Sequence, residues 1–482
     1  YRFCCLPSRG AIVNPDQSTS QPVTKAALVE KTVAMTEAGK FASFFQEGEL
    51  ETIQKLTVSG PLDASDIDTI RYQMPKLEVL DMKEVELIES NKTYGAEDHR
   101  EHYKLKKGVI TKKMLQCFSL LVTLVLPKDI TEIEDYGIYG NEKLVSVEIP
   151  VTVKKVGANA FKSCSSLQKV DLPSVETLGA SVFERCGKLT TVTLSLGLQA
   201  IPDNAFRDCG SLVDVPLPPS LVSIGTGAFE QCRSLTSVNM PNTVTTLNNS
   251  AYYVCTNLKE VKLSESLKNI GDASFCECGN LISIDIPASV STINSHAFRS
   301  CVKLETVTLH EGLQSIEGAS FSGCKSLVSV TIPETVTSIG VEAFDNSGLR
   351  SIIIPRSVTS MGDRAFAYSG LRSITIPETV TSVGGGILNG CSRLTSIFWE
   401  CNRDVPNIID LNSTSCLLYL SYDVKCPSTW KNVIEPGGVA QTIVLKNERW
   451  MVAPRQESGC WMNRSPWKNW RGSLAVPRSR MQ

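Results

Sequence analysis

Cysteine is the residue type whose number and spacing in this chain could do chemistry. The chain holds 17 cysteines among 482 residues, and nine of them occupy the same place in a repeated segment: Cys164, Cys186, Cys209, Cys232, Cys255, Cys278, Cys301, Cys324 and Cys391. Stacked segments would bring neighbouring sulfur atoms to about 5 Å, close enough to consider disulfides. Zinc instead needs four ligands around one point, and free cysteine is among the most buried residue types. We therefore predict an inert core ladder without metal or cofactor, with disulfides as the alternative.

The histidines offer a second possible chemistry, which is weaker. His99 and His102 form the sequence H-R-E-H beside Glu97, Asp98 and Glu101. Two His three residues apart could share a metal, but the pattern is not H-E-x-x-H and no third ligand is evident. We interpret this segment as a solvated loop. The sequence also contains no G-x-S-x-G, P-loop or dinucleotide-binding fingerprint, so we predict no catalytic residues and no enzyme.

A repeat positions the nine cysteines. Its pattern is A-F-x-x-C-x-x-L-x-x-V-x-[IL]-P-x-x-V-x-x-[IL]-G, and we call the Phe position the anchor residue. Copies of 22 or 23 residues have these anchors: Leu115, Ile138, Phe161, Phe183, Phe206, Phe229, Tyr252, Phe275, Phe298, Phe321, Phe344, Phe366 and Leu388. Because a fixed period of this length is typical of a solenoid, we predict stacked coils that share one continuous core.

Within one copy, the residue pattern predicts where the chain turns. Leu167, Val170 and Leu172 alternate as a short strand with one buried face. Pro173 would end that strand, since it has no N–H for a ladder. A second short extended segment would follow around Leu178, and the next residue, Gly179, would permit a tight corner.

Breaks in the repeat predict five segments. Residues 26–45 have an approximately helical period, Leu56–Leu62 and Leu77–Met82 resemble degenerate strands, and 89–108 is polar enough to be an insertion. The predicted division is as follows: 1–25 flexible lead-in, 26–108 N-terminal cap, 109–400 repeat array, 401–450 C-terminal cap, 451–482 basic disordered tail. Cys4 and Cys5 would suit an acylated start only behind an apolar segment, so a flexible start is preferred.

Composition excludes several classes of protein. The chain is 42% hydrophobic and 20% charged, which is typical of a globular protein. A net charge of −2 argues against nucleic-acid binding, which usually needs a basic face. No apolar run approaches the length of a transmembrane helix. We expect a monomer.

The repeat residues resemble the BspA-like leucine-rich-repeat proteins, the treponemal class of such repeats. The resemblance covers the array 109–400 and extends more loosely into both caps. In place of the Asn that follows the strand in commoner classes, this chain mostly has Thr or Ser, so we predict no Asn ladder. The resemblance implies an α/β repeat: a curved leucine-rich-repeat solenoid of about 13 copies, with short parallel strands on its concave face and capped ends.

The outward positions of the predicted strands would form a concave wall. Short hydroxyl side chains dominate it, with charges in its first half and apolar Ile353 and Phe398 near its end. A low-charge, hydroxyl-lined wall suits a protein or glycan better than a small buried ligand. The alternative is that Ser and Thr simply suit exposed strand positions. The predicted binding residues are Lys169, Asp171, Asp214, Asn239, Glu260, Lys262, Asp285, Thr308, Thr331 and Phe398.

Three hypotheses of function follow. The resemblance implies a non-enzymatic cell-surface or secreted adhesin that binds host matrix glycoproteins, host cells or other microbes. The alternative is an intracellular protein-interaction scaffold, which the many thiols would favour. A third hypothesis is that the repeats accompany a catalytic domain encoded beyond this sequence.

Overall fold

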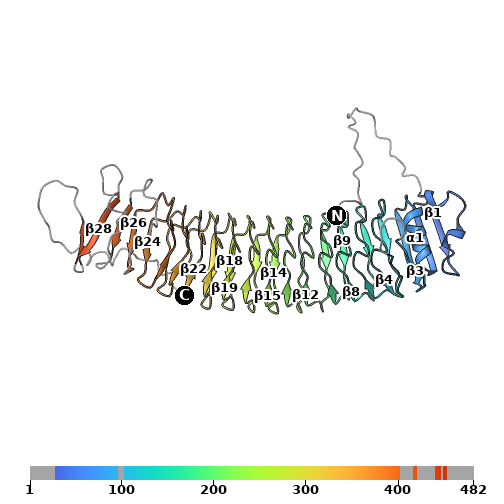
Figure 1. Ribbon diagram of the computed structural model, residues 1–482, viewed down its shortest axis with the longest axis horizontal. Coiled ribbons are helices and arrows are strands. Elements are labelled where there is room, and N and C mark those ends of the chain that lie inside the picture. Colours follow the sequence, from blue (N-terminus) through green and yellow to red (C-terminus); the bar gives the residue numbers. More distant parts are fainter. Residues whose placement is uncertain (1–27, 96–101, 402–415, 421–439, 447–448, 453–482) are drawn as a thin grey trace, which may run out of the picture. The chain divides into compact units, whose positions relative to one another are not determined.

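The computed structural model describes residues 28–95, 102–401, 416–420, 440–446 and 449–452 (Figure 1). The chain forms two compact units, Tyr1–Pro287 and Ala288–Gln482. The coils number about 16, more than the 13 regular copies, because less regular strands continue the stack beyond the repeats. The predicted solenoid is therefore confirmed.

Most regular coils contribute a strand to a first sheet and, shortly after, a two-residue strand to a second sheet; a few contribute only an isolated bridge to the first. In the first unit, neighbouring strands of the first sheet lie parallel in the order β1(Glu30–Ala34), β2(Lys55–Leu62), β3(Val79–Leu87), β5(Thr123–Val125), β7(Ser146–Glu148), β9(Lys169–Asp171) and β11(Thr191–Thr193). A separate parallel pair is β14(Ser237–Asn239) and β16(Glu260–Lys262), and β18(Ser283–Ile286) follows along the chain. This first sheet carries the predicted binding residues.

The second sheet of the first unit is also parallel. Its strands fall into two hydrogen-bonded groups. The first is β4(Val109–Ile110), β6(Glu132–Ile133), β8(Lys155–Val156) and β10(Thr177–Leu178), and the second is β12(Ala200–Ile201), β13(Ser223–Ile224), β15(Thr246–Leu247) and β17(Asn269–Ile270). In one copy, β9 ends before Pro173, and five residues separate it from β10. Both predicted extended segments are thus present, and Pro173 lies between them.

The second unit repeats this arrangement. Its second-sheet strands are β19(Thr292–Ile293), β21(Ser315–Ile316), β22(Ser338–Ile339), β23(Ser360–Met361) and β25(Ser382–Val383). Its first-sheet strands are β20(Thr306–Leu309), β24(Ser373–Ile376), β26(Ser396–Trp399), β27(Cys416–Leu420), β28(Ala440–Lys446) and the antiparallel β29(Arg449–Val452). The strands β27 and β28 lie in the predicted C-terminal cap, and β29 reaches two residues into the predicted tail; the rest of that tail lies outside the described residues.

A turn around the anchor residue closes each coil. Two residues before and after Phe161, Asn159 and Ser163 have φ values of 57° and 63°. This left-handed pair recurs around the other anchors, and it turns alternate N–H groups toward the next coil: the Phe161 N–H donates to the carbonyl of Val182 at 2.9 Å. The backbone groups of the turn are therefore satisfied between coils, and the described repeats contain no helix.

The core consists of buried rows that run through the stacked coils. Anchor rings stack face to face, as in the Phe161–Phe183 pair with centroids 5.3 Å apart and rings inclined by 16°. The Leu that follows each anchor by five or six positions is also buried, from Leu121 to Leu394. Each copy thus buries its Phe and Leu against the same residues of its neighbours, as the repeat pattern predicts.

Tyr252 is the one tyrosine among the anchors, and its buried hydroxyl destabilises the fold. The residue is 1% exposed, and its Oη has no hydrogen-bond partner among the described residues. Burying an unpaired hydroxyl costs about 1–3 kcal/mol. We expect Tyr252→Phe to raise the free energy of unfolding by about 1 kcal/mol, measured by urea denaturation. The reciprocal control, Phe206→Tyr, should lower it; equal stability of all three proteins would contradict this account.

Gly179 is required by close packing of neighbouring coils. Its φ is not in the left-handed region, but a Cβ at this residue would lie 2.2 Å from the backbone nitrogen of Ala158 in the preceding coil. The predicted reason for this glycine, a tight corner, is therefore incomplete. Left-handed φ values fall instead on residues such as Ser181, two positions later.

The N-terminal cap differs from its prediction. Residues Glu30–Ala34, predicted to be helical, form β1, which pairs in parallel with β2. The α-helix of the cap is α1(Ala64–Gln73), which the sequence analysis did not predict. Asp66 lies in its first turn, 2% exposed, and accepts the N–H groups of Gly39 and Phe41 at 2.7 and 3.0 Å. This carboxylate therefore ties the segment after β1 to α1.

Asp63, the N-cap residue of α1, makes the cap sensitive to acid. Burial opposes its ionisation, but hydrogen bonds from Ser65 and Lys92 outweigh burial and lower its pKa. A carboxyl with a lowered folded-state pKa contributes stability above its ordinary pKa of about 3.9, and that contribution is lost as the pH falls below it. We expect the hydrogen-exchange protection of the Ser65 amide to hold at neutral pH and to decrease below about pH 4.

The matched variant for this acid effect is Asp63→Asn. It should lower cap stability at neutral pH and remove the step in protection as the pH falls, because the titrating group is gone. An unchanged acid profile in Asp63→Asn would assign the effect to another carboxyl.

Candidate functional site

The cysteine ladder is structural. The twelve cysteines whose side chains the structure describes form no disulfide, and all except Cys117 are buried. Thiols of the ladder donate to the carbonyl of the anchor in the preceding coil; Cys186, for example, lies 3.2 Å from the carbonyl oxygen of Phe161. The eight such distances fall between 3.1 and 3.4 Å. The predicted core ladder is confirmed, and it also has a hydrogen-bonding role that the sequence did not reveal.

Burial makes these thiols unreactive. It raises the pKa of Cys164 to about 12 and raises those of Cys186 and Cys232 well above the ordinary value. The thiolate is the reactive form of cysteine, so a raised pKa together with full burial removes it. Among the described residues, no group of three His, Cys, Asp or Glu is placed to hold a metal ion.

Other residue types occupy the same rung where cysteine is missing. Asn141 donates to the carbonyls of Leu115 and Ile138 at 2.8 and 2.7 Å. Its side chain thus replaces the thiol as the donor to the anchor carbonyl of the preceding coil. Ser347 and Ser369 occupy the rung in the two shorter copies, and both are buried. The sequence signal for this substitution is the position that these residues share with the ladder cysteines, three residues after the anchor.

The polar insertion contributes little to a site. Tyr94 and Tyr103 form an antiparallel bridge across it, and His102 is exposed. His99 lies outside the described residues.

All ten predicted binding residues lie on the first sheet or in the coils that continue it. Nine are exposed and one, Phe398, is half-buried. The nine exposed residues are Lys169, Asp171, Asp214, Asn239, Glu260, Lys262, Asp285, Thr308 and Thr331. Parallel register places Asn239 opposite Lys262 and Ser237 opposite Glu260 on adjacent strands. Within the first unit, these residues are thus outward positions of the first-sheet strands and the coils between them. That they form a binding wall stays a prediction.

Two of the predicted charges neutralise each other. Lys169 Nζ lies 2.8 Å from Asp171 Oδ2 on the same strand, and the Thr193 hydroxyl donates to Asp171 at 2.7 Å. These interactions lower the pKa of Asp171. An exposed pair of this kind contributes little to stability, and each charge is less available to a partner. Asp214 differs, because within the described residues its carboxylate has no ion pair or hydrogen bond.

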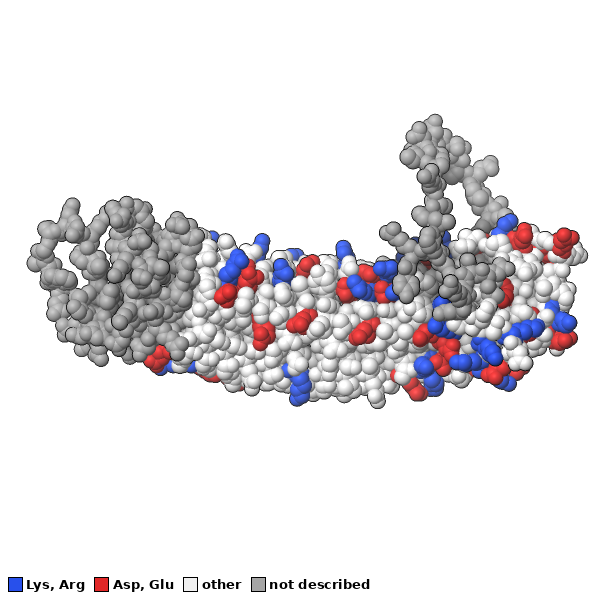
Figure 2. Space-filling model, in the orientation of Figure 1, with Lys and Arg blue, Asp and Glu red and all other residues white. Residues whose placement is uncertain are grey.

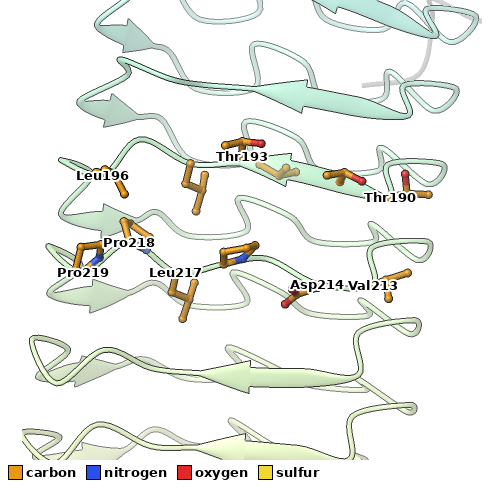
Figure 3. A pocket seen from close by; sticks show the side chains of 12 residues that line it. Thr190, Thr193, Leu196, Val213, Asp214, Leu217, Pro218 and Pro219 are labelled. Carbon is orange, nitrogen blue, oxygen red and sulfur yellow. The ribbon is translucent and has the colours of Figure 1, made fainter.

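The first sheet is interrupted one coil after β11. Here the sequence V-D-V-P-L-P-P places Pro216 where a ladder N–H is needed, and a proline cannot donate. The pairing between the two coils is reduced to an isolated bridge, Thr191 with Asp214. Figure 3 shows the coil 213–219 running as a loop beside the strand of the preceding coil.

A groove of about 440 Å³ lies at this interruption. Leu194, Leu196 and Leu217 line it together with Pro216, Pro218 and Pro219, while Thr190, Thr193 and Asp214 supply polar groups (Figure 3). Leu196 is 75% exposed. Ligand sites are usually mostly apolar hollows of about 300–1,000 Å³ with a few polar groups. The groove is thus the part of the first sheet best suited to hold a partner's side chain.

The sequence analysis identified only part of this groove. Asp214 was predicted as a binding residue. Leu196 and Val213 were missed, although both are exposed apolar residues, 75% and 46%. The available signal was the run of three prolines in a copy that otherwise follows the repeat.

Solved structures with similar folds are leucine-rich-repeat proteins. One is a leucine-rich repeat protein from Bacteroides ovatus, 22% identical, which covers 70% of this chain and 76% of its own with a TM-score of 0.48. A leucine rich cell surface protein from Faecalibacterium prausnitzii is 23% identical, with 67% and 93% covered and a TM-score of 0.44. The T. pallidum leucine-rich repeat protein is 26% identical, with 43% and 78% covered and a TM-score of 0.27. No curated protein matches the chain.

A family model matches the repeats directly. The description of that family is "BspA type Leucine rich repeat region", and its matches cover residues 109–235, 176–305 and 291–408. Together these ranges take in more than half of the chain, and they coincide with the coils that carry the anchor stack, the cysteine ladder and the groove. The chain therefore belongs to the BspA-type leucine-rich repeat family.

Proposed function

We propose that this protein is a non-enzymatic cell-surface or secreted adhesin that binds host matrix glycoproteins, host cells or other microbes through its solenoid surface. The groove between residues 190 and 219 carries the proposal, because it combines exposed apolar side chains with an unpaired carboxylate on an otherwise polar face. The coils that frame it are already ordered, so binding need not order them, which saves conformational entropy.

The thiols do not favour the intracellular alternative. Many free cysteines suggest a reducing compartment only where oxidation could reach them. Here eleven of the twelve described cysteines are buried, and burial raises the pKa of those in the ladder. An oxidising environment would leave such thiols intact. Separately, no helix among the described residues combines the length and apolar character needed to cross a membrane.

The test is binding of the purified full chain to immobilised matrix glycoproteins and glycans. We expect saturable binding that the double variant Leu196→Asp, Val213→Asp weakens by at least about tenfold, because it places charges inside the apolar groove. Val222→Asp is the matched control: Val222 is 43% exposed but lies outside the groove. Equal losses in both variants would show a non-specific effect and refute the groove as the site.

A third variant tests the charged half of the wall. Changing Lys169, Asp171, Glu260 and Lys262 together to Ser leaves the groove intact. Loss of binding in this variant alone would move the site from the groove to the charged strands β9 and β16. Absence of binding by every protein, including the unmodified chain, would refute the adhesin proposal for this panel and favour a scaffold.

A further inference from the structure

Charged side chains in the coils follow a rule of pairing across the stack. Residues 22 or 23 positions apart, which lie on adjacent coils, form ion pairs of opposite sign: Lys154–Glu176 at 3.2 Å, Lys162–Glu184 at 2.9 Å, Arg207–Glu230 at 3.0 Å, Arg364–Glu342 at 3.3 Å and Arg356–Glu378 at 3.7 Å. Figure 2 shows the result, with acidic and basic side chains often adjacent on the face in view. A stacked array favours this pattern, since like charges directly opposite each other are destabilising.

Arg350 and Arg372 break this rule within the second unit. They follow the buried Leu349 and Leu371 in two adjacent coils, and the N–H of Arg372 donates to the carbonyl of Arg350 at 3.3 Å. Both side chains are exposed. Within the described residues, neither guanidinium has an ion pair or a hydrogen bond. Two like charges are thus stacked on adjacent coils, and they lack the acidic partners that the five ion-paired cations have.

The basic character extends to the coils on either side. Lys325 lies in the coil before Arg350 and Arg393 in the coil after Arg372; both are exposed and, among the described residues, have no acidic partner. Acids of the same coils, Glu342 and Glu378, are paired elsewhere. Four consecutive coils therefore each carry a Lys or Arg without an acidic partner among the described residues. Each of these residues lies near the point where its coil enters the first sheet.

An exposed apolar side chain lies three residues beyond Arg350. Ile353 is 81% exposed, the most exposed large apolar residue of the described chain, and it forms a backbone bridge with Thr331. A single exposed apolar residue is ordinary, but this one lies three residues from Arg350 in the same coil. Carboxylates match the guanidinium fork in geometry and charge, and an isoleucine offers contact area only to an apolar group.

We propose that Arg350, Arg372 and Ile353 form a docking site for an acidic, extended peptide segment of a partner protein. Alternate side chains of an extended peptide point the same way, so carboxylates can reach the two arginines while an adjacent apolar side chain covers Ile353. A polyanionic saccharide would satisfy the arginines but leave Ile353 without a partner. This inference rests on the proposed interaction function, but it uses a different surface from the groove.

Fluorescence anisotropy with a short labelled peptide of repeated Glu-Glu-Leu units tests the site on the full chain. We expect saturable binding that weakens with rising ionic strength. Arg350→Ser with Arg372→Ser should weaken it at least about tenfold, as loss of two charge-assisted contacts would. The matched control is Arg356→Ser with Arg364→Ser, which removes the same charge from the same coils and should retain binding. Ile353→Ser should abolish the preference for this peptide over a Glu-Glu-Ser peptide.

Three results would overturn the proposal: no binding of the acidic peptide, equal losses in both arginine variants, or binding of heparin in place of the peptide. The last would mark a site for polyanionic saccharides. The Leu196→Asp, Val213→Asp variant should bind the peptide normally, so failure of the groove and failure of this site are distinguishable.

Discussion

Phe229→Ala is expected to lower the free energy of unfolding by about 3–5 kcal/mol, the usual cost of truncating a buried aromatic side chain. Phe229 is 1% exposed. Its ring stacks on Phe206 and Tyr252, with centroids 5.2 and 5.1 Å away. Removing it leaves a void between two rings that cannot collapse toward each other while the backbone spacing of the coils is fixed by inter-coil hydrogen bonds.

The effect of Phe229→Ala should be local before it is global. In a solenoid each coil contacts only its neighbours, so stability is a sum of coil and interface contributions. Urea denaturation followed by circular dichroism measures the total loss, and hydrogen exchange should show reduced protection first at the amides of Phe229 and Tyr252. Ile353→Ala, at an 81% exposed site, is the control and should change little. An unchanged unfolding curve for Phe229→Ala would mean that the anchor row is not the core.

The repeats could be predicted because one physical requirement is imposed many times. Each coil must bury the same side of itself against identical neighbours, so Phe, Cys and Leu recur at fixed positions, and thirteen copies average out local exceptions. The N-terminal cap has no such redundancy. There, apolar residues spaced like those of a helix form the edge strand β1, because the parallel ladder offered by β2 satisfies the backbone of Glu30–Ala34.

The helix of the cap was predictable from a signal that was not used. Asp63 and Asp66 precede Ile67 and Ile70 with the spacing of a capping box, a short pattern that indicates a helix start. The structure contains both reciprocal hydrogen bonds of that box. A residue pattern read only for hydrophobic period therefore places the helix in the wrong segment.

The candidate sites lie where the sequence departs from the repeat. Such departures are hard to predict from a pattern that describes only what the copies share. The groove arises because Pro216 lacks an N–H, which matters only once the neighbouring strand β11 is in place. Likewise Lys169 and Asp171 looked like two separate binding charges, but they pair with each other. The stacked Arg350 and Arg372 are unusual only in comparison with the ion pairs on other coils.

Gly179→Ala is expected to cost about 3 kcal/mol, at the upper end of overpacking effects. An added Cβ would lie 2.2 Å from the nitrogen of Ala158 and 2.4 Å from the carbonyl carbon of Gly157. Both atoms are backbone, so no side chain can move aside, and the coils themselves would have to separate. Glycines at which an added Cβ would lie 2.2–2.6 Å from a neighbouring atom recur at this position: Gly157, Gly225, Gly271, Gly340, Gly362 and Gly384.

Gly187→Ala is the matched control for this prediction. Gly187 lies eight residues later, in the next copy. Its φ is not in the left-handed region, and an added Cβ would meet no atom within 4 Å. The two variants make the same chemical change and remove the same backbone freedom from the unfolded chain, a change worth about 0.4–1 kcal/mol in favour of Ala where the site allows it. Urea denaturation should therefore show Gly187→Ala to be neutral or slightly stabilising and Gly179→Ala to be strongly destabilising. Equal stabilities of the two variants would mean that the coils lie farther apart than the contacts at Gly179 indicate. The close stacking that orders the groove and the arginine pair would then lose its support.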